Sequence, residues 1–165
     1  MRLSTRGRYA VMAMVELAAR EARAQVAAPG RKATPVSLAE IAASQMISLA
    51  YLEQLFGPLR RAELVLSARG PGGGYRLARA AHEITISQVV DAVEESIRTT
   101  RCEDGMPNCA AGQQCRTHDL WAELGDHIRF FLDGLTLADV LGETIQGRAS
   151  GPKDLRERIL ALAAQ

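Results

Sequence analysis

The sequence predicts a mainly α-helical protein, a winged helix-turn-helix with a small β-hairpin wing and a long dimerisation helix. Three observations lead to this fold class. Two short amphipathic helix patterns lie close together within 37–59, a glycine-rich turn joins two strand patterns within 64–77, and a long apolar helical stripe occupies 118–135. The composition agrees, because 47% of the residues are apolar but only 4% are aromatic, which favours packed helices over a β-sandwich.

The N-terminal segment predicts a helix from about Thr5 to Arg23. Its apolar residues recur with helical spacing and place one face toward the core: Val11, Met14, Val15, Ala18 and Ala19. Residues 24–35 contain proline, glycine and a basic pair, so we expect a loop there.

A helix-turn-helix is expected next. Ser37 and Glu40 have the spacing of a capping box, in which each side chain bonds to the backbone amide of the other residue. Gln45–Ile47 interrupts the short helix, and Ser48 caps a second helix, Leu49–Leu59. The residues expected to face inward are Leu38, Ile41, Ala42, Leu52, Leu55 and Phe56.

Residues 64–77 predict the wing. A strand at 64–67 and a return strand at 75–77 flank glycines that permit positive φ angles and close approach of the backbone to another molecule. Arg69 and Arg76 add positive charge. A glycine-rich loop can also cradle nucleotide phosphates, but this one lacks the Lys-Ser/Thr ending of a P-loop and no helix start follows it.

The second half of the chain predicts two longer helices. Thr85 caps the first, which extends to about Ile97, and the second ends near Leu135. The stripe residues are Ile86, Val89, Val90 and Val93 in the first helix and Leu120, Trp121, Leu124, Ile128, Phe131, Leu132 and Leu135 in the second. A second copy of the chain would cover the long stripe in an isologous dimer. Packing on the chain's own first helix is the alternative. A short helix from Thr136 and a terminal helix over Lys153–Ala164 complete the expected elements.

The charge is divided unevenly along the chain. Residues 1–80 carry twelve Lys and Arg residues against five Asp and Glu residues, whereas residues 81–165 carry eight against fourteen. A basic N-terminal half suggests nucleic acid as its partner, although uneven surface charge explains the pattern equally well. No segment approaches the roughly 18 apolar residues that span a bilayer, and no signal peptide pattern is present, so a cytoplasmic location without membrane contact is expected.

The three cysteines lie within 14 residues of each other, at Cys102, Cys109 and Cys115, and His118 follows. An odd number of clustered cysteines without a secretion signal argues against a disulfide framework and favours metal or redox chemistry. The gaps are wider than those of paired zinc knuckles and suit an iron–sulfur cluster, in which a histidine can replace a thiolate. Zinc binding and a metal-free thiol sensor stay open, because spacing alone fixes the metal loosely.

Four motifs make the chain similar to the IscR family of iron–sulfur cluster regulators over roughly residues 1–142. They are MRLSTRGRYAV at the start, ISLAYLEQLF at 47–56, ARGPGGGYRL at 68–77 and RCEDGMPNCAAGQQCRTHDLW at 101–121. The resemblance implies a homodimeric repressor and activator that binds double-stranded promoter DNA and a 2Fe–2S cluster. It also implies that the cluster-loaded form represses cluster-assembly genes, and that the cluster assembly machinery donates the cluster.

The resemblance implies particular roles for residues of this chain. The cluster ligands are Cys102, Cys109, Cys115 and His118. The DNA-binding residues are Ser48, Tyr51, Glu53, Gln54, Arg69, Gly72 and Gly73. Glu53 matches an acidic residue of the family that is thought to reject one class of DNA site unless the cluster is bound. This role fits the chemistry of a carboxylate, which accepts hydrogen bonds from the amino group of cytosine.

The chain departs from the family pattern at three places. The first cysteine gap is longer by one residue, Ala50 stands where a hydroxyl is common, and Pro58 is expected to end or kink the second helix of the helix-turn-helix. Related regulators that sense nitric oxide through a 4Fe–4S cluster share the fold. The spacing from Cys115 through His118 to Trp121 favours the IscR type over them.

No Ser/His/Asp set or acid–base pair accompanies the cysteines, so the chain is not expected to be an enzyme, and a cluster carrier or redox enzyme is disfavoured. The expected organisation is a winged helix-turn-helix DNA-binding domain over 1–80. A cluster-binding loop with dimerisation helices follows over 81–142, and a tail occupies 143–165.

Overall fold

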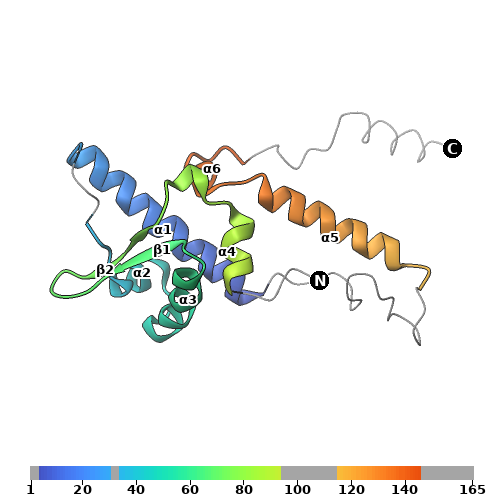
Figure 1. Ribbon diagram of the computed structural model, residues 1–165, viewed down its shortest axis with the longest axis horizontal. Helices are drawn as coiled ribbons and strands as arrows, with labels where there is room; N and C mark the ends of the chain where they lie inside the picture. Colours follow the sequence, from blue (N-terminus) through green and yellow to red (C-terminus); the bar gives the residue numbers. More distant parts are fainter. Residues whose placement is uncertain (1–3, 31–33, 94–114, 146–165) are drawn as a thin grey trace.

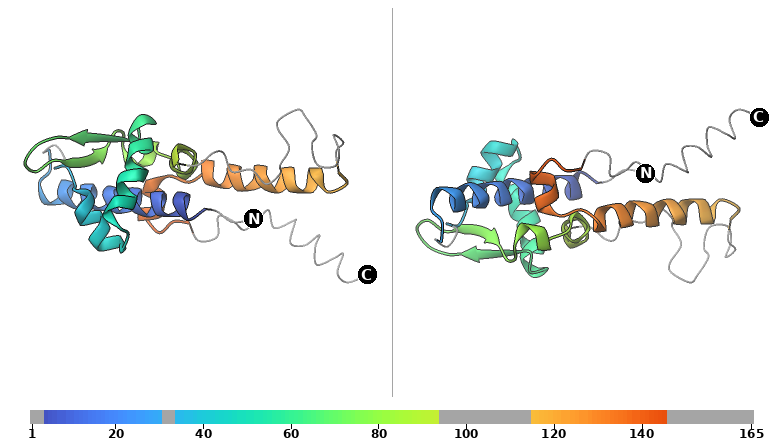
Figure 2. Two further views of the ribbon diagram at one scale, coloured as in Figure 1. Left: turned by 90° about the horizontal axis from the view of Figure 1, so that it is seen from below. Right: turned by 90° about the horizontal axis from the view of Figure 1, so that it is seen from above.

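The computed structural model describes residues 4–30, 34–93 and 115–145. Its elements are α1 (Thr5–Ala27), α2 (Leu38–Gln45), α3 (Leu49–Arg61), β1 (Val65–Ala68), β2 (Gly74–Leu77), the 3-10 turn η1 (Ala81–Glu83), α4 (Ile86–Val93), α5 (His118–Asp133) and α6 (Leu137–Leu141). Helices α1 to α4 and the β1–β2 hairpin gather into one body, and α5 extends away from it (Figure 1; Figure 2). None of the helices in the described ranges has the length and apolar character needed to cross a membrane.

Helix α1 is the central support of this body, and it contacts α2, α3, α4, α6 and β2. Ser4 caps it as its hydroxyl accepts hydrogen bonds from the amides of Arg6 and Gly7. Of the predicted inward face, Met14 and Ala18 are buried, whereas the other three residues are half-buried. The buried face is centred instead on Ala10, Ala13, Met14, Leu17 and Ala18. The small alanines permit α4 to approach α1 closely.

The end of α1 differs from the prediction. The helix continues four residues beyond Arg23, to Ala27, so residues 24–27 are helical rather than part of the expected loop. Alanine and glutamine are good helix formers, and Pro29 is the first residue that cannot continue the helix. The composition of residues 24–35 as a whole therefore predicted the boundary too early.

The helix-turn-helix has the predicted parts. The capping box is present, because the Glu40 amide donates to the Ser37 hydroxyl at 3.2 Å and the Ser37 amide donates to the Glu40 carboxylate at 2.9 Å. Met46 makes the turn in a left-handed conformation with φ 53°. The Ser48 hydroxyl then caps α3 by accepting from the Tyr51 amide at 3.2 Å.

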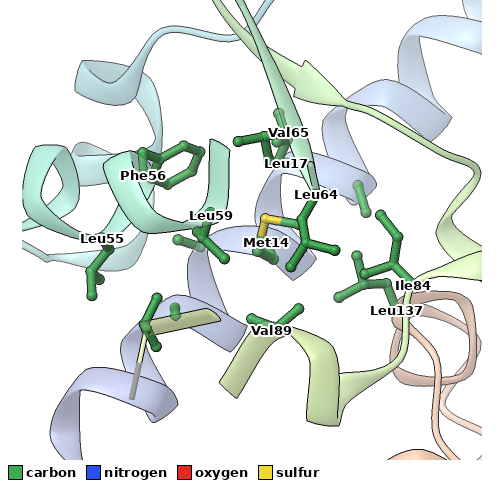
Figure 3. Close-up of a cluster of buried hydrophobic side chains, with 14 of the residues drawn as sticks. Met14, Leu17, Leu55, Phe56, Leu59, Leu64, Val65, Ile84, Val89 and Leu137 are labelled. Atoms are coloured by element: carbon green, nitrogen blue, oxygen red, sulfur yellow. The ribbon is translucent and has the colours of Figure 1, made fainter. Parts of the chain in front are cut away.

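Pro58 does not end α3, which continues through it to Arg61. Proline cannot donate to the carbonyl oxygen four residues earlier, that of Gln54, but Gln54 is an exposed residue and water can take this hydrogen bond. The inward residues Leu52, Leu55 and Phe56 are fully buried as predicted, and Leu59 joins them. All four belong to one core cluster. Figure 3 shows Leu55, Phe56 and Leu59 in this core with Met14 and Leu17 of α1 and Val89 of α4.

The wing is an antiparallel hairpin with Val65 opposite Leu77 and Ala68 opposite Gly74. Strand β1 is shifted by one residue from the predicted range, and β2 starts one residue earlier than predicted and ends as predicted. The outer edge of β2 also pairs with Val36, whose amide and carbonyl exchange hydrogen bonds of 2.8 Å with Tyr75. The Tyr75 ring lies edge-on to Phe56 of α3, with 4.8 Å between ring centroids.

The helices of the second half differ in burial. All four stripe residues of α4 are buried, as predicted, although the expected extension to Ile97 lies outside the described residues. Helix α5 starts and ends close to the predicted positions but buries none of its residues in this chain. Thr136 caps the predicted short helix α6 together with Asp139. The expected helix over 153–164 also lies outside the described residues.

Candidate DNA-binding surface and metal centre

The outward face of α3 carries the four side chains predicted to read bases. Ser48, Glu53 and Gln54 are exposed and Tyr51 is half-buried, while the opposite face of the helix lies in the core. The helix is therefore fixed by one face and presents hydroxyl, carboxylate and amide groups on the other. Groups of this kind can form hydrogen bonds to base edges in a major groove.

Tyr51 has a neighbour that the sequence reasoning did not identify. Its ring meets the ring of Tyr9, on α1, at an interplanar angle of 87° with 5.8 Å between centroids. An edge-to-face pair of this kind stabilises both rings and restricts how each can turn. Tyr9 on α1 thus restricts the orientation of the Tyr51 ring on α3. The helical spacing of α1 gives no indication of this contact.

The wing presents Arg69 at the beginning of its turn, where the side chain is exposed. Gly70 and Gly72 have positive φ angles of 100° and 74°, which favour glycine. A Cβ atom at Gly73 would lie 2.5 Å from the carbonyl oxygen of Ala68. Gly72 and Gly73 therefore have structural reasons to be glycine, because together they form the tight turn that presents Arg69.

Basic side chains surround these elements. The exposed ones are Arg6 and Arg8 at the start of α1, Arg60 and Arg61 at the end of α3, and Arg69 and Arg79 in and after the wing. Arg20 differs, because its guanidinium group is 2.7 Å from Glu16 and 3.6 Å from Glu40. Exposed arginines suit contacts with DNA phosphates, which position a protein on the duplex without reading its sequence.

Glu21 is a further residue that the sequence reasoning missed. Its carboxylate accepts a hydrogen bond of 2.6 Å from the amide of Leu77, the last residue of β2. Burial raises the pKa of Glu21, while this hydrogen bond and the positive charge of Arg76 act in the opposite direction. The two residues are separated by 56 positions in the chain, so no local pattern could connect them.

Two of the four expected metal ligands are described by the structure, and they lie at the start of α5. The amide of His118 donates to the carbonyl of Cys115 at 3.0 Å, so a single turn brings the two residues together. Both are half-buried, and the Cys115 Sγ lies 3.5 Å from the Thr117 hydroxyl. Cys102 and Cys109 lie outside the described residues.

The donor set at this turn fits iron or zinc. A thiolate and an imidazole are both ligands of these metals, and the N-terminus of α5 favours a nearby negative charge. A group of three or more candidate ligands is not found within the described ranges, which omit Cys102 and Cys109. One turn thus brings two of the four predicted ligands together, and their binding of a metal together with Cys102 and Cys109 stays a prediction.

A helix-turn-helix whose second helix faces solvent, followed by a glycine-tipped hairpin, defines the class of winged-helix DNA-binding proteins. The chain belongs to the Rrf2 family of iron-dependent transcriptional regulators, whose family model matches residues 3–143. The match covers the helix-turn-helix, the wing, the cysteine segment and α5.

The chain is similar to regulators that have been named or solved. IscR of Pectobacterium carotovorum, an HTH-type transcriptional regulator, is 46% identical over 141 residues, which cover 86% of this chain and 79% of that protein. The solved structure of T. potens IscR matches with a TM-score of 0.65 at 32% identity, covering 94% of this chain and 96% of the other. CymR, the global cysteine regulator of B. subtilis, matches with a TM-score of 0.68 at 31% identity, covering 87% and 98%. The predicted fold class and the resemblance to IscR are confirmed, and the chain's relatives are transcriptional regulators.

Proposed function

We propose that the chain is a homodimeric regulator that binds a 2Fe–2S cluster and controls promoters of cluster-assembly genes according to cluster status. The observation that carries this proposal is the combination of an exposed polar face on α3 with a cysteine and a histidine at the start of α5. The expected location is the cytoplasm, where promoter DNA and the cluster assembly machinery are both accessible.

The proposed DNA contacts involve α3 and the wing. Ser48, Tyr51, Glu53 and Gln54 would face base edges in the major groove, while Arg69 would reach DNA from the turn shaped by Gly72 and Gly73. Glu53 is the exposed carboxylate of this face. Because a carboxylate accepts hydrogen bonds from cytosine amino groups and is repelled by phosphate and thymine oxygens, Glu53 would restrict the sites that the protein accepts.

The proposed dimer involves α5. Leu120, Trp121 and Leu124 are 62%, 45% and 37% exposed, although they occupy the apolar stripe of the helix. A stripe of this length on a helix that extends from the body needs a partner surface, and the α5 of a second copy supplies an apolar stripe of the same length. The dimer would also place two wings and two α3 helices on one duplex.

The proposed cluster ligands are Cys102, Cys109, Cys115 and His118. Three thiolates and one imidazole would give the ligand set of a 2Fe–2S cluster, which supplies one-electron redox chemistry and sensitivity to iron supply. Cys115 and His118 are close enough to bind the same cluster, because one turn joins them. The cluster assembly machinery is the proposed donor.

Anaerobic reconstitution tests this proposal. The wild-type dimer should take up about two irons and two sulfides per chain, and the loaded and empty forms should differ in their preference among promoter duplexes. The matched control replaces Cys102, Cys109 and Cys115 with Ala, which should abolish iron uptake and leave the dimer and its basal DNA binding intact. Protein that holds no iron would exclude the cluster, and protein with no preference among duplexes in either form would exclude the regulator function.

The alternative is a regulator whose cysteines bind zinc or a 4Fe–4S cluster, or act as a thiol or nitric oxide sensor. The match to CymR is compatible with this alternative, because a regulator that is named for cysteine and not for an iron–sulfur cluster shares the fold. Elemental analysis of protein purified without air separates these cases. About two irons and two sulfides per chain support the 2Fe–2S cluster, and about four of each support a 4Fe–4S cluster. Zinc alone supports a zinc site, and absence of both metals supports a thiol sensor.

A further inference from the structure

The wing strand β2 is held along both of its edges. One edge pairs with β1, from Val65 opposite Leu77 to Ala68 opposite Gly74. On the other edge Tyr75 exchanges two backbone hydrogen bonds with Val36. Residues two apart in a strand direct their amides to the same edge, so Leu77 presents its amide beside this pair. Among the residues that the structure describes, no backbone carbonyl accepts a hydrogen bond from this amide, and the carboxylate of Glu21 accepts one instead, at 2.6 Å.

Helix α1 therefore contacts both elements of the proposed DNA-binding surface. Near its start, Tyr9 holds Tyr51 of α3 through their edge-to-face ring contact. Twelve residues later, or about 18 Å along the helix axis, Glu21 holds the base of the wing through Leu77. A helix is stiff over this length, so α1 helps to fix the distance between the recognition helix and the wing, together with the direct contact of Phe56 in α3 with Tyr75 in β2.

A carboxylate at this position is costly. Burial disfavours its ionised form, and within the described residues no cation lies within ion-pair distance of Glu21. In return, a charged acceptor makes a shorter and stronger hydrogen bond than a neutral one, which defines the position of the donor more closely. A buried carboxylate therefore costs stability but defines the position of the Leu77 amide, which fits a residue that fixes the location of β2.

We propose that Glu21 is a positioning residue for DNA binding, which anchors β2 to α1 and so holds Arg69 at a fixed place relative to α3. This inference rests on the proposed DNA-binding function. Glu21 lies at the base of the wing, beside Leu77, and the proposed DNA contact of the wing is Arg69, at the opposite end of the hairpin. Its effect on binding is therefore transmitted through the wing.

A double-mutant cycle on the full-length dimer tests this role. The probe is a promoter duplex selected by the wild-type protein, with a scrambled duplex of equal length as reference. Glu21→Ala should weaken binding to the selected duplex by about 5- to 10-fold, and adding it to Arg69→Ala should cause less than about a twofold further loss, since coupled residues are not additive. Binding to the scrambled duplex should stay within twofold. Additive losses, or unchanged binding by Glu21→Ala, would overturn the proposal.

Two further substitutions keep the test valid if Glu21→Ala folds poorly. Glu21→Gln keeps an acceptor at the same reach and should retain binding within about twofold. Glu21→Asp keeps the charge but withdraws it by one methylene group, so it should behave like Glu21→Ala. If Asp supports binding as well as the wild type does, the reach of the acceptor to Leu77 does not matter, and the proposal is wrong.

The matched control is Glu16→Ala. Glu16 lies on the same helix and accepts hydrogen bonds from Arg20 at 2.7 Å and Gln45 at 3.2 Å, and neither of these partners belongs to the wing. Its replacement should lower stability, and its effect on DNA binding should be additive with that of Arg69→Ala. If Glu16→Ala also weakens DNA binding in the wild type but not in Arg69→Ala, the double-mutant cycle reports general destabilisation. That result would contradict a specific role for Glu21.

Amide hydrogen exchange separates failure of this inference from failure of the proposed function. In the DNA-free dimer, Glu21→Ala should speed exchange at Leu77 and across the wing while leaving α3 unchanged. If the wild-type protein prefers no duplex but this change occurs, the proposed function fails and the anchoring of the wing stands. If exchange at Leu77 is unchanged, Glu21 does not anchor the wing.

Discussion

Helices α3 and α5 both have an apolar stripe, but only α3 buries it within the chain. Four apolar side chains of α3 are completely buried against α1, α4 and the hairpin. Helix α5 has sixteen residues and buries none, and Leu120, Trp121 and Leu124 of its stripe remain exposed. The comparison shows that an amphipathic pattern identifies a face that needs a partner, without saying whether the partner belongs to the same chain.

The largest expected effect comes from making the same truncation in both helices. Leu55→Ala, in the core, should lower the free energy of unfolding by about 2–5 kcal/mol, because it leaves a cavity. Leu124→Ala, on α5, should instead shift the proposed dimer toward monomer and lower the unfolding free energy only as far as dimerisation contributes to it. Urea denaturation at several protein concentrations, with sedimentation of each variant, measures both quantities.

The result that would break the comparison is a concentration-independent loss for Leu124→Ala with no change in oligomeric state. That outcome would mean that α5 packs on its own chain in solution, which is the alternative to the dimer. Glu123→Ala is the control on the polar side of α5, where it is exposed, and it should leave sedimentation unchanged.

Local patterns predicted most of the fold, and the errors have a common cause. The caps at Ser37, Ser48 and Thr136 and the buried face of α3 follow from residues only a few positions apart. The face of α1 was placed off centre because its true neighbours, α3 and α4, are distant in sequence. For the same reason the contacts of Tyr9 with Tyr51 and of Glu21 with Leu77 could not be seen.

The candidate site follows the same rule. The outward residues of α3 and the glycine turn were predictable because helical spacing and turn chemistry decide which side chains face solvent. Cys115 and His118 could be paired from their spacing alone, and one turn joins them. Whether Cys102 and Cys109 join them depends on the path of residues 94–114, which local patterns do not decide.

Substitutions at two glycines, Gly74 in β2 and Gly57 in α3, test how closely the chain segments around the wing and α3 are packed. Gly74→Ala should cost about 1–3 kcal/mol, because a Cβ atom there would lie 2.3 Å from the carbonyl oxygen of Val36 and force the outer edge of β2 apart. Gly57→Ala is the matched control inside α3, where the nearest atom would be the Arg61 side chain at 3.8 Å. It should raise stability by about 0.5–1 kcal/mol through helix propensity. Thermal or urea unfolding measures both, and equal effects would contradict the close approach at Gly74.

Two glutamates of α1 should give opposite pH dependences. Burial opposes ionisation of Glu16, but hydrogen bonds from Arg20, Ser44 and Gln45 and the charge of Arg20 outweigh it, so its pKa lies below the ordinary value of 4.5. Its contribution to stability is present above pH 4.5 and is lost as the pH falls through the lowered pKa. Glu16→Gln should therefore cost about 1 kcal/mol at pH 7 and little at low pH.

Glu21 has the opposite sign, because burial raises its pKa above 4.5. Because the folded protein favours the protonated form of Glu21, protonation contributes to folding stability. This contribution is fully present below pH 4.5 and is lost as the pH rises through the raised pKa. Glu21→Gln should equal the wild type in stability near pH 4 and match or slightly exceed it at pH 7. Urea denaturation across this range measures both slopes, and slopes of the same sign would contradict the assignment.

The smallest effect concerns Met46, an exposed apolar residue that lies outside any stripe. Its side chain is 94% exposed, and its backbone is left-handed with φ 53°. Met46→Gly should raise the unfolding free energy by about 0.5 kcal/mol, because relief of the left-handed strain exceeds the added entropy of the unfolded chain. Met46→Ala keeps the strain and should show no such gain. Neither variant should alter sedimentation, since exposure of a single side chain does not make an interface. A weaker dimer in Met46→Gly would mean that the first half also contributes to the dimer, and the contrast between α3 and α5 would no longer hold.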